Sequence, residues 1–208
     1  MSTETTPAPR RERSEQRGWR LTDLVLIAVL GAVFGFLYYA LVQGWLALSI
    51  AMGPLGDLAQ NVLWGGWMVV APLALFITRK PGAGIVAELI ASIVEVVVLG
   101  SPVGPQLFIT ALVQGVGAEL VFTSTRYRRW DWVTFAMSGL VGGALIFVYE
   151  AFLLGWWAQG ELLIWRLVIH LVSCLVLCGL LARVIGVALL RTGVLDNFAV
   201  GRVSRAGA

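Results

Sequence analysis

Six long apolar segments alternate with short polar connections along the chain. The segments cover residues 21–45, 58–78, 82–100, 106–125, 132–157 and 163–190. A helix that crosses a bilayer needs about 20 apolar residues, with a range of about 17–25. The third segment is at the short end of this range, whereas the fifth and sixth are long enough to tilt or to include interfacial turns. The pattern predicts an all-α membrane protein, a bundle of six transmembrane helices.

Positive charge alternates between the connections. The N-terminal tail, the 79–81 and 126–131 connections and the C-terminal tail contain nearly all of the Lys and Arg residues. The 46–57, 101–105 and 158–162 connections contain none. Lys and Arg favour cytoplasmic loops. The alternation therefore predicts a multi-pass protein whose N- and C-termini are both cytoplasmic.

The composition supports one membrane domain with short tails. Of the 208 residues, 59% are hydrophobic and 13% are charged, whereas soluble domains contain about a quarter charged residues. We expect a disordered cytoplasmic basic tail over residues 1–20, a transmembrane substrate-binding domain over 21–190 and a cytoplasmic C-terminal tail over 191–208. The basic tail adjoins a hydrophobic helix, so it favours orientation in the lipid bilayer over nucleic acid as a partner.

Four acidic side chains fall inside the predicted helices. They are Glu88, Glu95, Glu119 and Glu150. Placing one acidic side chain at mid-membrane costs about 3 kcal/mol on insertion scales. We therefore expect these side chains to face the interior of the bundle or a water-filled cavity.

The predicted topology separates the four glutamates by depth. Glu95 and Glu150 lie at similar depth towards the outer face, which makes them the best candidates for an outward-facing binding site. Glu88 and Glu119 lie deeper, where either a ligand or a backbone or side-chain partner could hold them. Arg166 lies near the outer start of the last helix, where it could neutralise Glu150, pair with Glu161 or extend outward.

Uncharged polar and aromatic side chains accompany the glutamates. The candidate substrate-binding residues of this kind are Tyr38, Asn61, Trp64, Trp67, Gln114 and His170. Indole rings stack on heterocycles and attract cations, and carboxylates accept hydrogen bonds from amino groups. The set suits a flat, nitrogen-rich or cationic solute, although packing or lipid contact is the alternative for any single tryptophan.

The chain shows no indication of a cofactor, a metal or an enzymatic centre. His170, Cys174 and Cys178 repeat every four residues, but successive steps of about 6 Å are too long for one ion. A disulfide between the two cysteines is not expected either. Neither a P-loop nor a GxSxG or HExxH motif occurs. Any energy source would therefore come from a partner.

Small residues recur at intervals of four in the first segment. Ala28 and Ala32 form one such pair, and Gly31 and Gly35 form another. Small residues with this spacing let a second helix approach closely. The stripe is a candidate docking face for another membrane subunit.

Two glutamate-centred motifs resemble those of a known family. The first is Arg79-Lys80-Pro81-Gly82-Ala83-Gly84-Ile85-Val86-Ala87-Glu88-Leu89, continuing to Glu95 and Leu99-Gly100-Ser101-Pro102. The second is Gln114-Gly115-Val116-Gly117-Ala118-Glu119-Leu120-Val121-Phe122, followed by Arg126-Tyr127-Arg128-Arg129. Both resemble the YkoE-type substrate-binding subunits (S-components) of energy-coupling factor (ECF) transporters. The resemblance covers about residues 21–190.

The resemblance implies the S-component of an ATP-driven vitamin importer in a prokaryotic plasma membrane. The solute would be thiamine or its hydroxymethylpyrimidine precursor, bound near the outer face. The partners would be a transmembrane T-component and two cytoplasmic ATPase subunits. The Ala28–Ala32 motif is similar to the one that S-components use against the T-component. The main alternative is an autonomous, proton-coupled secondary transporter of a small cationic solute.

Overall fold

The computed structural model describes residues 18–206, and this part of the chain contains helices and turns but no strand. Five of its helical stretches are long and apolar enough to cross a membrane: Leu21–Met52, Gly56–Thr78, Leu107–Ser124, Trp132–Leu153 and Glu161–Arg191. The predicted 82–100 segment is also helical, over Ala83–Val98. The all-helical membrane fold predicted from the sequence is therefore confirmed.

Three of these stretches are single α-helices: α2 (Leu21–Met52), α6 (Leu107–Ser124) and α7 (Trp132–Leu153). The others change their winding along their length. The second contains α3 (Gly56–Ala59), the 3-10 segment η2 (Gln60–Met68) and α4 (Val70–Thr78). The Ala83–Val98 stretch contains α5 (Ala83–Ile93) and the π-helical turn η3 (Val94–Val98). The last contains α8 (Glu161–Ser173), the π-helical η5 (Cys174–Leu181) and α9 (Ala182–Arg191).

Two boundaries differ from the sequence prediction. Helix α2 continues seven residues beyond the predicted end at residue 45, because no helix-breaking residue occurs before Gly53, whose φ is 52°. The predicted C-terminal tail contains a further helix, α10 (Ala199–Ala206), which packs against α4. Leu195 and Val200 are buried in the core. Residues 1–17, most of the predicted basic tail, lie outside the described residues.

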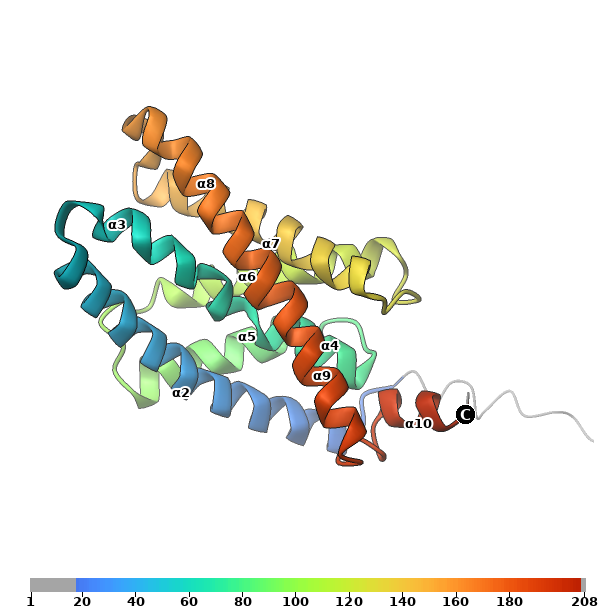
Figure 1. The fold of residues 1–208 in the computed structure, drawn as a ribbon. Coiled ribbons are helices and arrows are strands. Elements are labelled where there is room, and N and C mark those ends of the chain that lie inside the picture. Colours follow the sequence, from blue (N-terminus) through green and yellow to red (C-terminus); the bar gives the residue numbers. More distant parts are fainter. Residues whose placement is uncertain (1–17, 207–208) are drawn as a thin grey trace, which may run out of the picture.

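The helices form a ring around α4. Helix α2 packs on α5, α5 on α6, α6 on α7, and α7 on α8 and η5. The segment η2 contacts α2, α8 and η5 and so connects the two ends of this series. Helix α4 contacts α2, α5, α6, α9 and α10. Figure 1 shows the start of α2 and helix α10 at the same end of the bundle.

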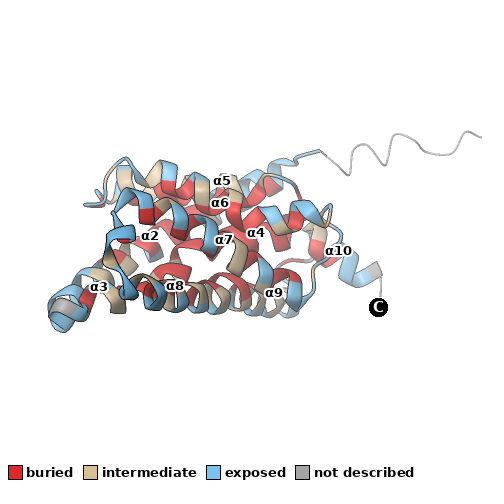
Figure 2. Cartoon of the chain, turned by 90° about the horizontal axis from the view of Figure 1, so that it is seen from above, coloured by how far each residue is buried: buried red, intermediate tan, exposed pale blue. Residues whose placement is uncertain are grey.

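Burial distinguishes the central stretch from those around it. In an apolar window of 18 residues, 83% of the residues are buried in the Gly56–Thr78 stretch, compared with 33% in α2. Figure 2 shows buried residues turned towards the interior and exposed residues on the outer faces of the helices. The exposed residues of α2 are largely apolar, as expected for a helix surrounded by lipid.

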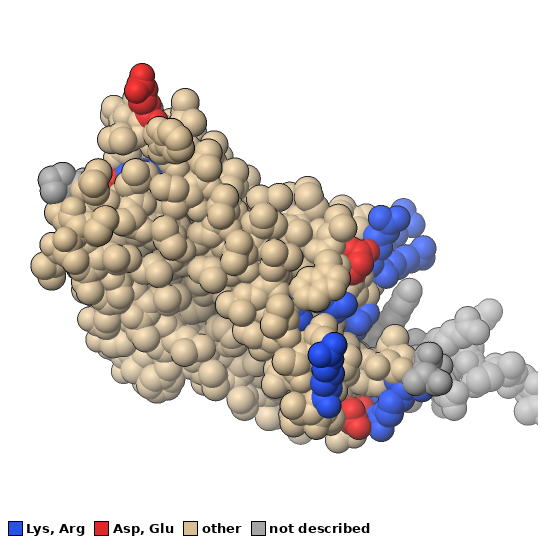
Figure 3. All heavy atoms as spheres, viewed as in Figure 1, with Lys and Arg blue, Asp and Glu red and all other residues tan. Residues whose placement is uncertain are grey.

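Charge is concentrated at the two ends of the molecule. Figure 3 shows a flank without charged residues between them, with Lys and Arg gathered near α10. We call this the charged end; it includes the start of α2, Arg79, Lys80 and the 126–131 connection. The opposite end contains the connections 53–57, 100–106 and 154–160, and we call it the cavity end.

Glycines bring α6 and α7 into backbone contact. A Cβ atom added to Gly117 of α6 would lie 2.9 Å from the Cα of Gly142 in α7. Such an approach is typical of small residues at helix interfaces in membranes. It holds the two helices that carry much of the cavity wall at a fixed spacing.

Candidate solute-binding site

A cavity of about 320 Å³ lies at the cavity end of the bundle. Its walls come from α2, η2, η3, α6 and α7, and from the connection between η3 and α6. The lining residues are Val42, Trp45, Leu46, Trp64, Trp67, Glu95, Pro102, Val103, Gln106, Leu107, Thr110, Gln114, Glu150 and Leu154. Small-molecule sites are clefts of about 300–1,000 Å³ lined by apolar and aromatic groups with few polar ones. The cavity matches this description at its smaller limit.

Glu95 and Glu150 both line this cavity. Each is almost fully buried, at 1% and 3% exposed. Ser101 Oγ donates a hydrogen bond of 3.0 Å to Glu95 Oε1. Within residues 18–206, the Glu150 carboxylate has neither a hydrogen bond nor an ion pair. A buried carboxylate without a partner is costly unless something else binds it.

The π-helical turn η3 determines where Glu95 and Ser101 lie. Leu99 N–H donates to the Val94 carbonyl across five residues, and Ser101 N–H donates to the Glu95 carbonyl across six. This wider winding brings Ser101 back over the Glu95 carboxylate. Isolated π-helical turns are frequent at functional sites.

Three indole rings form one aromatic wall of the cavity. The ring centroids of Trp45 and Trp64 are 5.5 Å apart, those of Trp45 and Trp67 5.8 Å, and those of Trp64 and Trp67 5.9 Å. The 3-10 winding of η2 places Trp64 and Trp67, three residues apart, on the same side. Trp64 Nε1 is buried without a hydrogen-bond partner among the described residues, so it is available as a donor to a solute.

Three polar residues, two on α6 and one at its N-cap, line the same cavity as the tryptophans. Gln106, Thr110 and Gln114 are spaced by four residues, and all three line the cavity. Thr110 Oγ1 is buried and has no partner in the described structure. Sequence reasoning selected Gln114 but missed Thr110, Gln106 and Trp45. The four-residue repeat of polar residues ahead of Gln114 is the signal that could have found the first two.

Glu88 and Tyr38, both predicted to bind substrate, do not line the cavity. Tyr38 Oη donates to Glu88 Oε1 at 3.2 Å and accepts from Val70 N–H at 3.2 Å. Ala71 N–H also donates to Glu88 Oε1, at 3.2 Å. These bonds join α2 and α5 to the start of α4. Both side chains thus bond within the core, and their contact with a solute stays a prediction.

Glu119 is also engaged elsewhere, at the charged end. Its Oε1 accepts from the Gly82 N–H at the start of α5 and from Tyr127 Oη, the latter at 2.7 Å. Burial raises the pKa of Tyr127 to about 12. The hydroxyl is protonated at neutral pH even at the ordinary tyrosine pKa of about 10, so it can donate to Glu119. Glu119 thus accepts from an N–H at the N-terminus of α5, and its predicted substrate contact stays a prediction.

Asn61 and His170 lie behind the cavity wall. Asn61 Nδ2 donates to the Asp57 carbonyl at 2.9 Å, which stabilises the turn at α3. His170 Nε2 is 3.1 Å from the Gly143 carbonyl, and its ring packs on Trp64 and Phe147. Both are fully buried outside the lining, and their contact with a solute stays a prediction.

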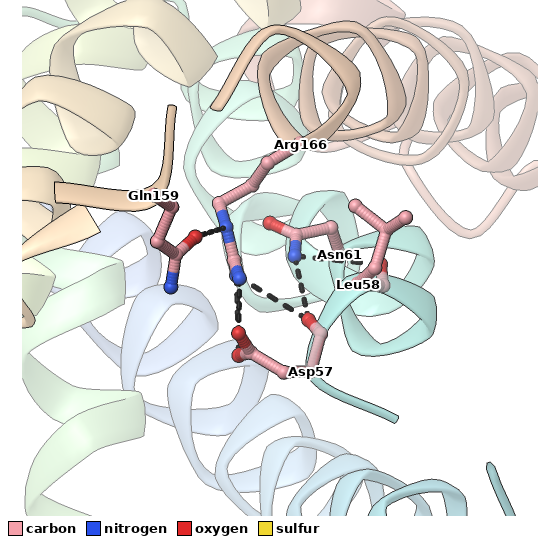
Figure 4. A network of polar contacts seen from close by, with 5 residues as sticks. All are labelled: Asp57, Leu58, Asn61, Gln159 and Arg166. Carbon is pink, nitrogen blue, oxygen red and sulfur yellow. Dashed lines mark hydrogen bonds and ion pairs between the residues drawn. The ribbon is translucent and has the colours of Figure 1, made fainter. Parts of the chain in front are cut away.

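Arg166 pairs with an acid that the sequence did not suggest (Figure 4). Its guanidinium bonds both carboxylate oxygens of Asp57, and its Nε donates to Gln159 Oε1 at 3.0 Å. It also stacks on Trp156, with Cζ 4.4 Å from the ring centroid. The predicted pairing with Glu161 or Glu150 is wrong, because α3 brings Asp57 against α8. Arg166 therefore does not neutralise Glu150, which lines the cavity.

The two pairs of small residues on α2 have different surroundings. A Cβ on Gly31 would lie 2.5 Å from Ile90 Cγ2, and one on Gly35 would lie 2.7 Å from Val94 Cβ. These glycines are buried against α5 and η3, which corrects their predicted place on a docking face. Ala28 is exposed and Ala32 is half-buried. Only the alanine pair is accessible from outside this chain.

In the described part of the chain, the cysteines form no disulfide and no cluster of side chains is arranged to bind a metal ion. Cys174 and Cys178 are free and buried. No group of three or more His, Cys, Asp or Glu residues within 18–206 could hold a metal ion.

Comparison with known proteins identifies the family. A family model described as the permease component of an ABC-type cobalt transport system matches residues 22–145. A protein of Bacillus subtilis (strain 168), provisionally named HMP/thiamine permease protein YkoE, is 35% identical over 188 residues, which cover 89% of this chain and 92% of the relative. A solved structure described as an S-component of an ECF transporter superposes with a TM-score of 0.83 at 34% identity, covering 91% of this chain and 95% of the other.

This chain belongs to the YkoE-type S-components of ECF transporters. The resemblance inferred from the two glutamate motifs is thereby confirmed. As an S-component, it is a substrate-specific subunit of a membrane transporter and not an enzyme. It is a multi-pass protein of the plasma membrane.

Proposed function

We propose that this S-component captures thiamine or hydroxymethylpyrimidine for import. The observation that carries the proposal is the meeting of Glu95 and Glu150 with three tryptophans in one small cavity. The relative named as an HMP/thiamine permease supports the same solutes. A cavity near the lower size limit of ligand sites favours a small solute over a large cofactor.

The cavity offers the chemistry that these solutes need. Thiamine carries a thiazolium cation and an aminopyrimidine, whereas hydroxymethylpyrimidine has only the pyrimidine. The unpaired Glu150 carboxylate can balance the cation or accept from the amino group. The aromatic wall can stack on either ring. Gln114, Thr110 and Trp64 supply further polar atoms.

The same proposal includes six membrane crossings with both termini in the cytoplasm. The Ala83–Val98 stretch would be the sixth crossing, and its 16 residues span about 24 Å at 1.5 Å per residue. An even number of crossings agrees with α10 and the start of α2 lying at the same end of the bundle (Figure 1). The gathering of Lys and Arg at that end supports a cytoplasmic location.

Labelling of introduced thiols tests this topology. Cys174 and Cys178 are buried and should react little, so they give a low background. A membrane-impermeant maleimide added to whole cells should modify Ala158→Cys at the cavity end but not Ser204→Cys in α10. The reverse labelling would contradict the orientation.

Transport energy would come from a T-component and two ATPase subunits. The chain contains no P-loop of its own. The exposed Ala28 on α2, with the half-buried Ala32, is the proposed contact with the T-component. Purified protein in liposomes should bind solute without accumulating it. Proton-driven accumulation by the chain alone would favour the secondary transporter instead.

A thermal-shift panel on detergent-purified protein tests the solute. A ligand that binds only the folded state adds about 2.7 kcal/mol of stability at 100 times its dissociation constant. Thiamine or hydroxymethylpyrimidine should raise the melting temperature, whereas riboflavin and biotin should not. Replacing both Glu95 and Glu150 with Gln should abolish the shift. The matched Glu161→Gln variant, exposed at the same end, should retain it. No shift with either pyrimidine compound would overturn the solute assignment.

A further inference from the structure

Two arginines at the charged end lie against one aromatic ring without an acidic partner. Arg79 follows the last residue of α4, and Arg183 lies on α9. Their guanidinium carbons are 5.5 Å and 4.8 Å from the centroid of the same Phe76 ring. The three ion pairs within residues 18–206 use Lys80, Arg166 and Arg205. Like charges are thus held near one another with no carboxylate bound to either.

Both guanidinium groups are also partly removed from water. Arg183 Nε is buried and has no hydrogen-bond partner in the described residues. Burial, followed by the nearby Arg183 charge, lowers the pKa of Arg79 to about 10. The charge of Asp131 acts on Arg183, but the two form no ion pair, and the Asp131 carboxylate caps α7 by accepting from Thr134 N–H at 2.8 Å. Partly buried cations without a carboxylate partner favour the binding of an anion from outside the chain.

The residues around the two arginines have the character of a membrane interface. Arg79 Cζ lies 4.2 Å from the Trp130 centroid, and Arg183 Cζ lies 5.5 Å from the Trp132 centroid. Tryptophans are enriched where the hydrocarbon meets the headgroups. Trp132, Val133 and Val184 are 48%, 70% and 50% exposed. An anion that binds here would have an apolar surface beside it. Such surroundings suit an amphipathic molecule with an anionic group and an apolar tail.

We propose that Arg79 and Arg183 bind the phosphate of an anionic phospholipid, whose acyl chains lie along the exposed apolar flank of α7 and α9. Guanidinium groups bind phosphate oxygens in pairs of hydrogen bonds. Basic pockets between membrane helices on the cytoplasmic side are typical headgroup sites. The site lies at the opposite end from the solute cavity and does not depend on the identity of the solute.

Native mass spectrometry of the purified full-length chain tests the site, with phosphatidylglycerol and phosphatidylcholine as probes. Wild-type protein should bind phosphatidylglycerol about tenfold or more tightly than phosphatidylcholine. Replacing Arg79 and Arg183 with Gln should reduce this preference to about twofold or less. Replacing both with Lys, which keeps the charges, should retain part of it. The matched control is Arg128→Gln with Arg191→Gln, which removes two exposed charges at the same end and should leave the preference intact.

Three results would overturn the proposal. Equal affinity of wild-type protein for the two lipids would show that the headgroup charge is not recognised, which would leave a protein carboxylate as the remaining anion. Equal losses in the control and the site variant would show diffuse attraction at the charged end. Displacement of phosphatidylglycerol by excess inorganic phosphate would show a site for small anions. The comparison on wild-type protein decides the question even if the Gln variant does not fold.

Discussion

Buried acids at the two ends of the bundle differ in the number of partners that the chain gives them. Towards the charged end, Glu119 bonds a helix N-terminus and a tyrosine, and Asp23 pairs with Lys80. Glu88, in the core, accepts from Tyr38 and from a backbone N–H. At the cavity end, Glu95 has one serine partner and Glu150 has none among the described residues. Glu88 and Glu119 each have two partners within the chain at one carboxylate oxygen, while their second oxygen is buried without a partner among the described residues. Glu95 and Glu150 have fewer internal partners and line the cavity, where another molecule can reach them.

The largest effect should follow from breaking an internal pair. Lys80→Met leaves the Asp23 carboxylate buried without its cation, and both side chains are less than a tenth exposed. Removing one partner of a buried ion pair costs about 3–5 kcal/mol. The free energy of unfolding in detergent should fall by this amount, while solute affinity of the folded fraction stays unchanged. An Asp23→Leu, Lys80→Met double variant should recover most of the loss; equal instability of both would contradict the assignment.

Removal of the unpaired charge should affect binding without affecting the fold. Glu150→Gln should weaken thiamine binding by about 1.5–3 kcal/mol, the range for hydrogen bonds to charged groups. Stability should be equal or greater, because a neutral amide replaces a buried carboxylate. Isothermal titration should also show a smaller loss for hydroxymethylpyrimidine, which lacks the cation. Equal losses for both solutes would show that the carboxylate recognises the pyrimidine.

Tyr38→Phe should give the opposite pattern. The hydroxyl donates to Glu88 and accepts from the buried Val70 N–H. Leaving such groups unpaired costs about 1–3 kcal/mol of stability. The melting temperature should fall and the dissociation constant of the solute should not change. Weaker solute binding at equal stability would place Tyr38 in the binding site after all.

Thr110→Val should have the smallest effect. The valine is similar in shape, and it removes a hydroxyl that has no partner among the described residues. Stability should therefore be unchanged or slightly higher, while solute affinity should fall by about 0.5–1.5 kcal/mol, the value of one neutral hydrogen bond. Titration of Thr110→Ser, which retains the hydroxyl, should show near-normal affinity.

The sequence predicted local and periodic features better than distant pairings. Runs of apolar residues were sufficient for the helices, and the two motifs around Glu88 and Glu119 were sufficient for the family. The depth argument grouped Glu95 with Glu150, and the structure places both on one cavity. Whether they bind the solute stays a prediction.

The partners of the polar groups could not be predicted in the same way. Tyr38 and Glu88 are 50 positions apart, and Arg166 and Asp57 are 109 apart. Such pairs depend on how the helices pack, which hydropathy does not encode. The same holds for Gly31 and Gly35: their spacing indicates a close helix contact, but not that the partner is α5 of the same chain.

The backbone contact between Gly117 and Gly142 couples two helices of the cavity wall. Helices α6 and α7 leave no side-chain layer between them at that point, so they can neither separate nor slide without losing close packing. They carry Thr110, Gln114 and Glu150 as one rigid frame.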